Sequence, residues 1–207
     1  VSTAQANSIA SAMSGVLTAT ISDGDISTLS GLSTAANDAI TITITDTSVA
    51  SASLSALDGK TSVAINAANI TTLTGNAADI ASAYTAGAAG TISGLGNEAV
   101  TVSDQPTVTQ LVTINNGTTG NITLNTVSGA LSDTAANLAA ALAGTITTYT
   151  GAVTVTDQPT VAQLVTINNA VSGAITLDTV SGNLTGAAAD LSAAFAGTIT
   201  TYTGDLT

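Results

Sequence analysis

The side chains that could do chemistry in this sequence are nearly all carboxylates. The chain has 13 aspartate and glutamate residues and a single basic residue, Lys60, with no histidine and no cysteine. Paired carboxylates can act as general acid and base, and several oxygen ligands together can hold calcium. A Ser-His-Asp triad, a thiol nucleophile and the common zinc sites all require residue types that this sequence lacks.

The charge balance excludes further classes of protein. The formal net charge is −12 at pH 7. A nucleic-acid binder needs Lys and Arg to displace counterions from phosphates, and a phosphoryl-transfer enzyme needs similar cationic clamps. No apolar run approaches the ~18–20 residues that span a bilayer. We therefore expect a chain that is not an enzyme, has no cofactor or metal, binds no nucleic acid and does not insert into membranes.

Three aspartates recur at the end of a predicted strand, just before a predicted helix. They are Asp46, Asp104 and Asp157. Aspartate is a favoured N-cap residue because its carboxylate accepts hydrogen bonds from the first free N–H groups of a helix. Catalytic carboxylates would need two acids in one cleft, whereas these occur one per repeat. We expect each of them to cap the helix that follows it.

A second recurring set lies at the end of the second predicted strand. It consists of Asn66, Asn125 and Asp178. Such side chains often bond to backbone groups in turns. We expect a ladder in which each side chain bonds the backbone of the next coil's turn; the alternative is a set of exposed turn residues.

The only local acidic cluster is Asp23-Gly24-Asp25. A calcium site is conceivable there, because calcium takes several carboxylate and carbonyl oxygens. Neither the spacing of an EF-hand loop nor the calcium-binding nonapeptide repeat follows the cluster. We favour a turn in which Asp25 caps a helix.

These positions recur because the chain is built from repeats. Residues 99–151 and 152–204 align without a gap at a period of 53, and 39 of the 53 positions are identical. A diverged copy occupies 39–98, and a partial, diverged copy occupies 1–38, where residues 1–22 match 72–93. We therefore divide the chain into 1–38, 39–98, 99–151 and 152–207, all parts of one continuous array, and expect it to be a segment of a longer one.

One repeat predicts two strands and two helices. In 152–204, residues 152–156 alternate apolar and polar positions as a strand does. Pro159 suits a first helical turn, and an apolar stripe continues from Val161. Residues 173–178 predict a second strand, and the Ala-rich stretch 186–197 predicts a second helix. The unit is β-α-β-α, about 53–58 residues long.

Strands joined through single helices should be parallel, with right-handed crossovers. A repeating coil of strand and helix predicts an α/β repeat solenoid with a parallel sheet, as in leucine-rich repeats. The alternatives are a doubly wound α/β domain and a β-helix. Large side chains are expected to form a hydrophobic plug near the end of the second helix; these are Met13, Tyr84, Leu142 and Phe195.

Four stretches of the sequence resemble a known family. They are LTGNAADIASAY (73–84), ISGLGNEAVTVSD (92–104), TSVAINAANITTLTG (61–75) and AGTITTYTG (143–151). They are similar to the tandem repeats of giant extracellular proteins of marine unicellular cyanobacteria. The resemblance covers essentially the whole chain and is weakest over 23–38. It implies an extracellular structural role, and it carries no catalytic residues.

The sequence thus predicts a structural, non-enzymatic segment of a long extracellular or cell-surface repeat protein. Its partners would be further copies of the same repeat, and it could form a fibre or coat by end-to-end stacking. Trypsin-like proteases would find one cut site, at Lys60. The alternative is an adhesin or phage-fibre module that binds glycans, with Tyr149 and Tyr202 as a stacking row. A β-helical polysaccharide lyase or hydrolase is the third hypothesis.

Overall fold

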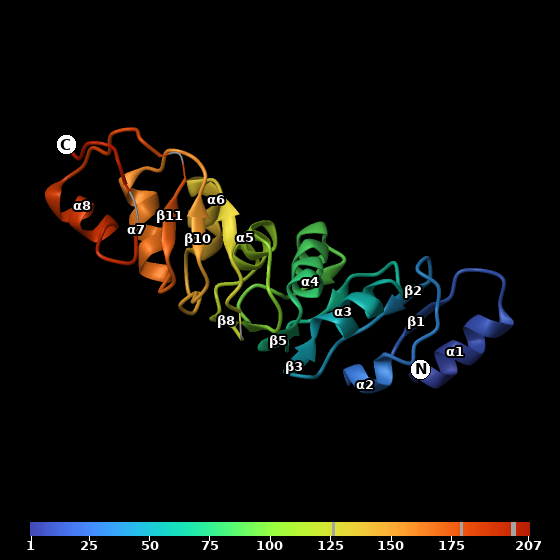
Figure 1. The fold of residues 1–207 in the computed structure, drawn as a ribbon. Coiled ribbons are helices and arrows are strands. Elements are labelled where there is room, and N and C mark those ends of the chain that lie inside the picture. Colours follow the sequence, from blue (N-terminus) through green and yellow to red (C-terminus); the bar gives the residue numbers. More distant parts are fainter. Residues whose placement is uncertain (126, 179, 200–201) are drawn as a thin grey trace.

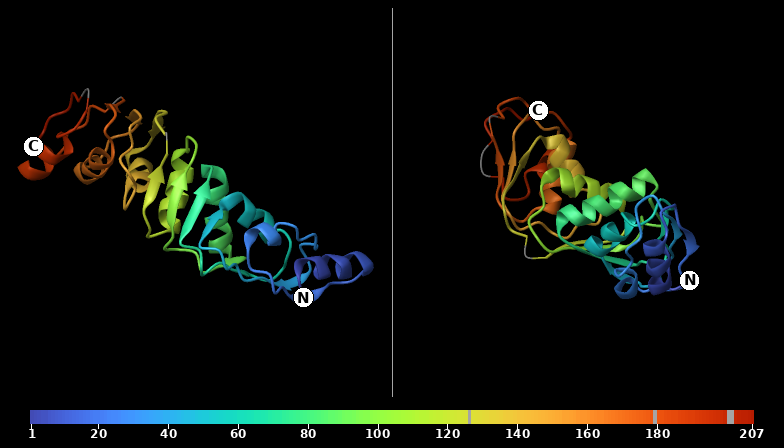
Figure 2. Two further views of the ribbon diagram at one scale, coloured as in Figure 1. Left: turned by 90° about the horizontal axis from the view of Figure 1, so that it is seen from below. Right: turned by 90° about the vertical axis from the view of Figure 1, so that its right-hand side faces the viewer.

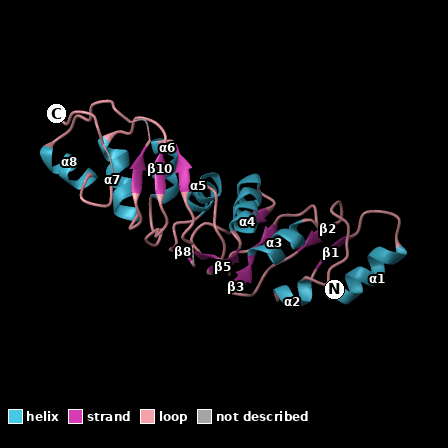
Figure 3. Ribbon diagram, viewed as in Figure 1, coloured by secondary structure: helices cyan, strands magenta, loops and turns pink. Residues whose placement is uncertain are grey.

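The computed structural model describes residues 1–125, 127–178, 180–199 and 202–207. They form a mixed α/β fold in which helices and short strands alternate along an elongated molecule (Figures 1 and 3). The termini lie at opposite ends of the long axis, and the elements follow that axis in sequence order (Figure 2). The helices are α1 (Thr3–Ala12), α2 (Ile26–Leu29), α3 (Ser51–Asp58), α4 (Ala77–Ala89), α5 (Val108–Gly117), α6 (Ala135–Leu142), α7 (Val161–Ala170) and α8 (Ala188–Ala194).

Every strand pair formed by the described residues is parallel. The sheet orders are β1-β2, β3-β5-β7-β8, β4-β6 and β11-β10-β9. The strands are β1 (Thr18–Thr20), β2 (Ala39–Thr41), β3 (Ser48–Ala50), β4 (Ile65–Asn66), β5 (Thr72–Gly75), β6 (Ile92–Ser93), β7 (Ala99–Val102), β8 (Ile122–Leu124), β9 (Leu131–Asp133), β10 (Val153–Val155) and β11 (Ile175–Leu177).

Each pairing joins neighbouring parts of the chain. We call the stretch between two successive helices, and the one after α8, an extended segment. Each extended segment pairs with the next, with one helix between them. Partner residues lie 21 to 27 positions apart, as for Thr18 opposite Ala39 and Thr72 opposite Ala99. Each 53-residue sequence period therefore contains two of these strand-to-strand spacings.

The core runs along the molecule beneath these segments. It consists of two clusters of buried side chains, and Leu124 and Ile146 pack against both. Alternating strand residues such as Val100 and Val102 point inward, as their spacing predicts. From α2 to α8, each helix packs against the next one in sequence. No helix in the described parts of the chain is both long and apolar enough to cross a lipid bilayer.

Three glycines mark a corner where successive segments come unusually close. A β-carbon built on Gly151 would overlap the carbonyl oxygen of Gly129, and one on Gly173 would overlap the carbonyl oxygen of Gly151. We call these residues the glycine column (Gly129, Gly151 and Gly173). Only glycine permits this approach, because any side chain would push the backbones apart.

Two local expectations are corrected. Pro159 lies before the N-cap of α7, which is Thr160, and not within the first helical turn. Met13 is 45% exposed and does not plug the core, whereas Tyr84 and Leu142 are buried. The reason is a shift of one helical turn. The first residue of α1 is Thr3 and that of α4 is Ala77, so the helices correspond at an offset of 74 and not 71.

Candidate functional site

We predicted that Asp46, Asp104 and Asp157 each cap the helix that follows them in the sequence, and this prediction is wrong. The N-cap of α5 is Thr107 and that of α7 is Thr160, and each forms a capping box with a glutamine three residues later, Gln110 or Gln163. The N-cap of α3 is Ala50, which has no side-chain oxygen to offer. The T-x-x-Q pattern was visible in the sequence and is a known N-terminal signal.

Each aspartate instead caps the preceding helix. Its carboxylate accepts a hydrogen bond from the backbone N–H of the first residue of that helix. The pairs are Asp46 with Ile26 of α2 (2.5 Å), Asp104 with Ala77 of α4 (2.7 Å), Asp157 with Ala135 of α6 (2.7 Å), and also Asp23 with Thr3 of α1 (2.6 Å). We call these four residues the inter-segment caps (Asp23, Asp46, Asp104 and Asp157).

The strand register explains this geometry. The N–H of Ser103 donates to the carbonyl of Gly75 (2.9 Å), which sets Asp104 beside the start of α4. The N–H of Thr156 donates in the same way to the carbonyl of Asp133 (3.0 Å). A carboxylate is stabilised there by the free N–H groups and the positive end of the helix dipole. The inter-segment caps therefore tie each of these helices to the segment that follows it.

The predicted turn ladder is wrong for Asn66. Its Oδ1 accepts from the N–H of Ala68 in its own turn (3.1 Å), a local bond two residues on. Asn125 and Asp178 follow β8 and β11, and their backbone N–H groups donate to the carbonyls of Val102 and Val155, both at 2.9 Å. All three side chains are on exposed residues. For Asn125 and Asp178 the ladder stays a prediction.

Sequence reasoning missed Glu98, the one glutamate in the chain, which is fully buried. Its Oε1 accepts from the Tyr84 hydroxyl (2.5 Å), and its Oε2 accepts from the N–H groups of Gly96 (2.8 Å) and Asn97 (3.1 Å). Burial, together with the bond to Glu98, raises the pKa of Tyr84 above its ordinary value. The carboxylate thus serves as an internal acceptor that orders the turn before β7.

Asp38 lies directly before β2, as Glu98 lies directly before β7. Its Oδ1 accepts from the N–H of Leu17 (2.7 Å) and its Oδ2 from the N–H of Ala35 (2.8 Å). The signal that could have found both residues is an acid directly before an alternating strand, in DAITIT (38–43) and EAVTVS (98–103).

Tyr149 belongs to a clamp that spans three segments. Its hydroxyl donates to the carbonyl of Gly129 and accepts from Nε2 of Gln105 (2.9 Å), whose Oε1 accepts from the N–H of Gly129 (2.7 Å). Burial raises the pKa of Tyr149. Tyr202 packs against Phe195 at 5.3 Å between ring centroids. Tyr149 is fully buried and so is not available to stack on a glycan.

Threonine hydroxyls also connect successive extended segments. The hydroxyl of Thr61 donates to the carbonyl of Ile40 (2.7 Å), that of Thr118 to Glu98 (2.7 Å), and that of Thr145 to Gly120 (2.6 Å). Each bond reaches the preceding extended segment and satisfies a backbone carbonyl there. About a fifth of the chain is threonine, and this use accounts for part of that composition.

The acidic cluster at 23–25 is used by the chain itself. Asp25 is the N-cap of α2, as expected. Its carboxylate accepts hydrogen bonds that lower its pKa below the ordinary value; the bond from the Ser27 hydroxyl has the larger effect and the bond from the Thr28 N–H the next. Asp23 caps α1. Among the residues that the structure describes, no three acidic side chains lie close enough to share a metal ion.

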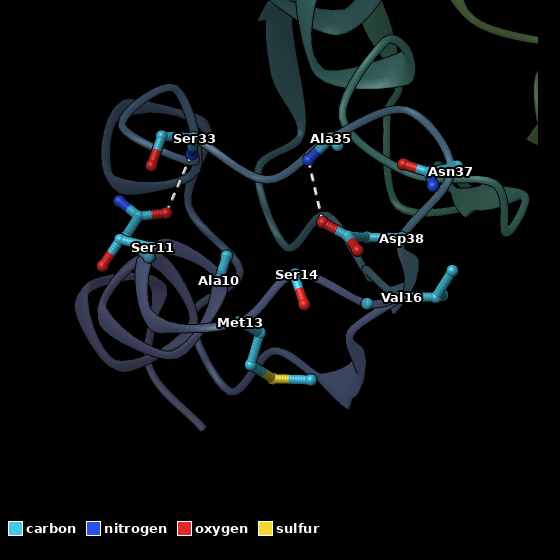
Figure 4. Close-up of a pocket in the computed structure, with 11 residues that line it drawn as sticks. Ala10, Ser11, Met13, Ser14, Val16, Ser33, Ala35, Asn37 and Asp38 are labelled. Atoms are coloured by element: carbon cyan, nitrogen blue, oxygen red, sulfur yellow. Dashed lines mark hydrogen bonds between the residues drawn. The ribbon is translucent and has the colours of Figure 1, made fainter.

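A pocket of about 400 Å³ lies between the end of α1 and the turn before β2 (Figure 4). Two of its polar side chains, Asn7 and Asp38, already accept hydrogen bonds from backbone N–H groups. The N–H of Ser33 donates to Oδ1 of Asn7, and Ala35 donates to Asp38 (Figure 4). Met13 and Val16 supply exposed apolar surface at its rim. The pocket therefore presents the chain's own internal bonds and not a set of convergent reactive groups.

Comparison with protein-family models, with curated proteins and with solved structures finds no match to this chain.

Proposed function

We propose that this chain is a structural, non-enzymatic segment of a repeat solenoid in a long extracellular or cell-surface protein. The observation that carries the proposal is the repetition of one bonding pattern between successive segments. Each of four helix starts receives a carboxylate from the next segment, at a sequence separation of 20 to 27 residues. Such nearest-neighbour contacts are what hold repeat proteins together.

The strand order supports a solenoid over a doubly wound sheet. In each sheet the described strands follow one another in sequence order without reversal. A doubly wound sheet reverses its order at a switch point, where its ligand binds. A solenoid has no such point, and its repeated geometry holds successive segments together.

The extracellular location rests on composition and on resemblance. The chain is acidic, has one lysine and no arginine, and so offers one site to trypsin-like proteases. The four sequence stretches quoted above resemble the tandem repeats of giant extracellular proteins of marine unicellular cyanobacteria. A coat or fibre is exposed to proteases for long periods, which this composition suits.

Deletion of residues 99–151 tests the solenoid. The deletion joins Glu98 to Ala152, which takes the place of Ala99, so every segment keeps a matching neighbour. We expect a cooperatively folded protein whose maximum dimension in X-ray scattering is about a quarter shorter. Deletion of 99–138 joins Glu98 to the middle of α6 and should not fold. Equal loss of structure in both deletions would contradict the solenoid.

Surface labelling tests the location. An antibody raised against this chain should label intact cells of the source organism as strongly as permeabilised ones. Labelling that requires permeabilisation would refute the extracellular assignment, whatever the fold.

A further inference from the structure

A groove between α2 and α3 combines an apolar floor with the one basic side chain of the sequence. Its volume is about 240 Å³. One wall is formed by the end of α2 and the turn that follows it, and the other by α3 and Lys60 just beyond that helix. Along the molecule, α1 precedes this pair of helices and α4 follows it (Figure 1). The groove therefore lies between segments of the array and not at an end of it.

The groove forms because α2 is only one helical turn long. This helix has four residues, whereas α3, against which it packs, has eight. After Leu29 the chain bends, and the N–H of Gly31 donates to the carbonyl of Thr28 (3.1 Å). The second half of α3 therefore has a turn beside it instead of a helix, and the groove occupies the remaining space.

The groove surface suits an aliphatic chain. Its floor consists of the buried side chains Leu29, Leu32 and Leu57. Its α3 wall carries Ala52 and Ala56, which lie four residues apart on one side of the helix and are exposed. The small alanine side chains leave room for a ligand. A hydrocarbon chain placed there would remove apolar surface from water on both sides of the contact.

Lys60 adds a positive charge at one end of this apolar surface. It follows Ala56 by four residues. Its N–H donates to the carbonyl of Leu57 (2.9 Å), and its own carbonyl accepts from the Thr34 hydroxyl (2.8 Å), so its backbone is held beside the groove. In the described part of the chain the Lys60 ammonium forms no hydrogen bond and no ion pair. A lysine stem can lie on apolar surface while its ammonium stays in water.

The other charges of the chain make Lys60 the place where an anion can bind. Asp58, the acid nearest to it in sequence, accepts from the Thr91 hydroxyl (3.0 Å), which belongs to the segment after α4. The net charge of −12 repels anions from the surface as a whole. The groove volume equals about eight times the ~30 Å³ that one water molecule occupies in the liquid. A tail of about seven or eight carbons would therefore fill it.

We propose that this groove binds a free medium-chain fatty acid. The hydrocarbon tail lies between the leucine floor and the alanine wall, and the carboxylate meets the Lys60 ammonium. The contacts that hold successive segments together are not used, so the proposal does not depend on the proposed structural role. For a ligand of this size in an open groove, we expect a dissociation constant of about 0.1–1 mM.

Calorimetric titration of the 207-residue chain with octanoate tests the site. We expect one saturable site, and binding of acetate, which has no tail, at least about tenfold weaker. Lys60→Met keeps a long, unbranched side chain without the charge. It should weaken octanoate binding about threefold to fivefold and leave the binding of octan-1-ol unchanged, because only the carboxylate interacts with the ammonium.

A second variant fills the groove and has a matched control. Ala56→Leu should weaken octanoate binding at least about tenfold, because the larger side chain occupies the space of the tail. Ala56 is the sixth residue of α3, and Ala140 is the exposed sixth residue of α6, a helix of the same length. Ala140→Leu makes the same change away from the groove and should bind octanoate as the wild type does. Circular dichroism should show an unchanged fold for both variants.

The single lysine also allows the site to be located directly. After labelling with ¹³C-lysine, the ε-carbon of Lys60 gives one signal, which should shift on addition of octanoate and saturate at the calorimetric dissociation constant. Absence of saturable binding to the wild type would overturn the proposal. So would octanoate binding that is the same in Ala56→Leu and Ala140→Leu, or that is unchanged in Lys60→Met.

Discussion

Replacing Gly151 with valine is expected to unfold the chain's carboxyl-terminal half. A β-carbon at this position would overlap the carbonyl oxygen of Gly129, which is backbone and cannot rotate away. It would also lie 2.9 Å from the Tyr149 hydroxyl. Overpacking against flexible side chains costs about 1–3 kcal/mol, and here the strand pairing itself must separate. We expect a loss above about 3 kcal/mol, measured by urea denaturation.

The matched control is Gly15→Ala. A β-carbon on Gly15 would meet nothing within 4 Å. The free energy of unfolding should therefore stay within about 0.5 kcal/mol of the wild type, as is usual for surface substitutions. If Gly151→Val were as mild as Gly15→Ala, the close approach of the glycine column would be disproved.

Replacing Glu98 with alanine is expected to have the second-largest effect. The substitution leaves three donors without an acceptor: the buried Tyr84 hydroxyl, the N–H of half-buried Gly96, and the N–H of Asn97, which is an exposed residue that water can reach. Each unsatisfied buried donor costs about 1–3 kcal/mol. We expect a total loss of about 3 kcal/mol or more in the free energy of unfolding, measured by urea denaturation.

Two comparisons isolate the carboxylate's role. Glu98→Gln keeps one acceptor oxygen and the shape of the side chain, so it should lose less than Glu98→Ala. Asp190→Asn removes one negative charge from an exposed residue and should change stability by less than about 1 kcal/mol. A Glu98→Ala variant as stable as Asp190→Asn would show that the buried bonds contribute little.

The element types were largely predictable because periodicity is a local property. Residues 152–156 and 173–178 contain β10 and β11, and the stripe that begins at Val161 is α7. The strand β9 (Leu131–Asp133) was missed because its sequence, LSD, has one apolar residue and no β-branched residue. The sequence repeat predicted parallel pairing between neighbours, which the described strands confirm.

The partners of the acidic side chains were not predictable in the same way. Asp104 and Asp157 have the right residue type and the right place to cap the next helix, and local reasoning favours that choice. Their real partners depend on the strand register, which places residues 20 to 27 positions apart side by side. Glu98 was missed for a related reason, since the hydroxyl from which it accepts belongs to Tyr84, on the preceding helix α4.

The inter-segment caps give the chain a direction of folding. The first N–H of α4 obtains its carboxylate from Asp104, 27 residues later, and that of α6 obtains it from Asp157, 22 residues later. During synthesis from the amino terminus, each of these helices is completed only when the next segment emerges. Folding therefore follows the emerging chain with a delay of one segment. No distant part of the polypeptide is needed to complete the segments that have already emerged.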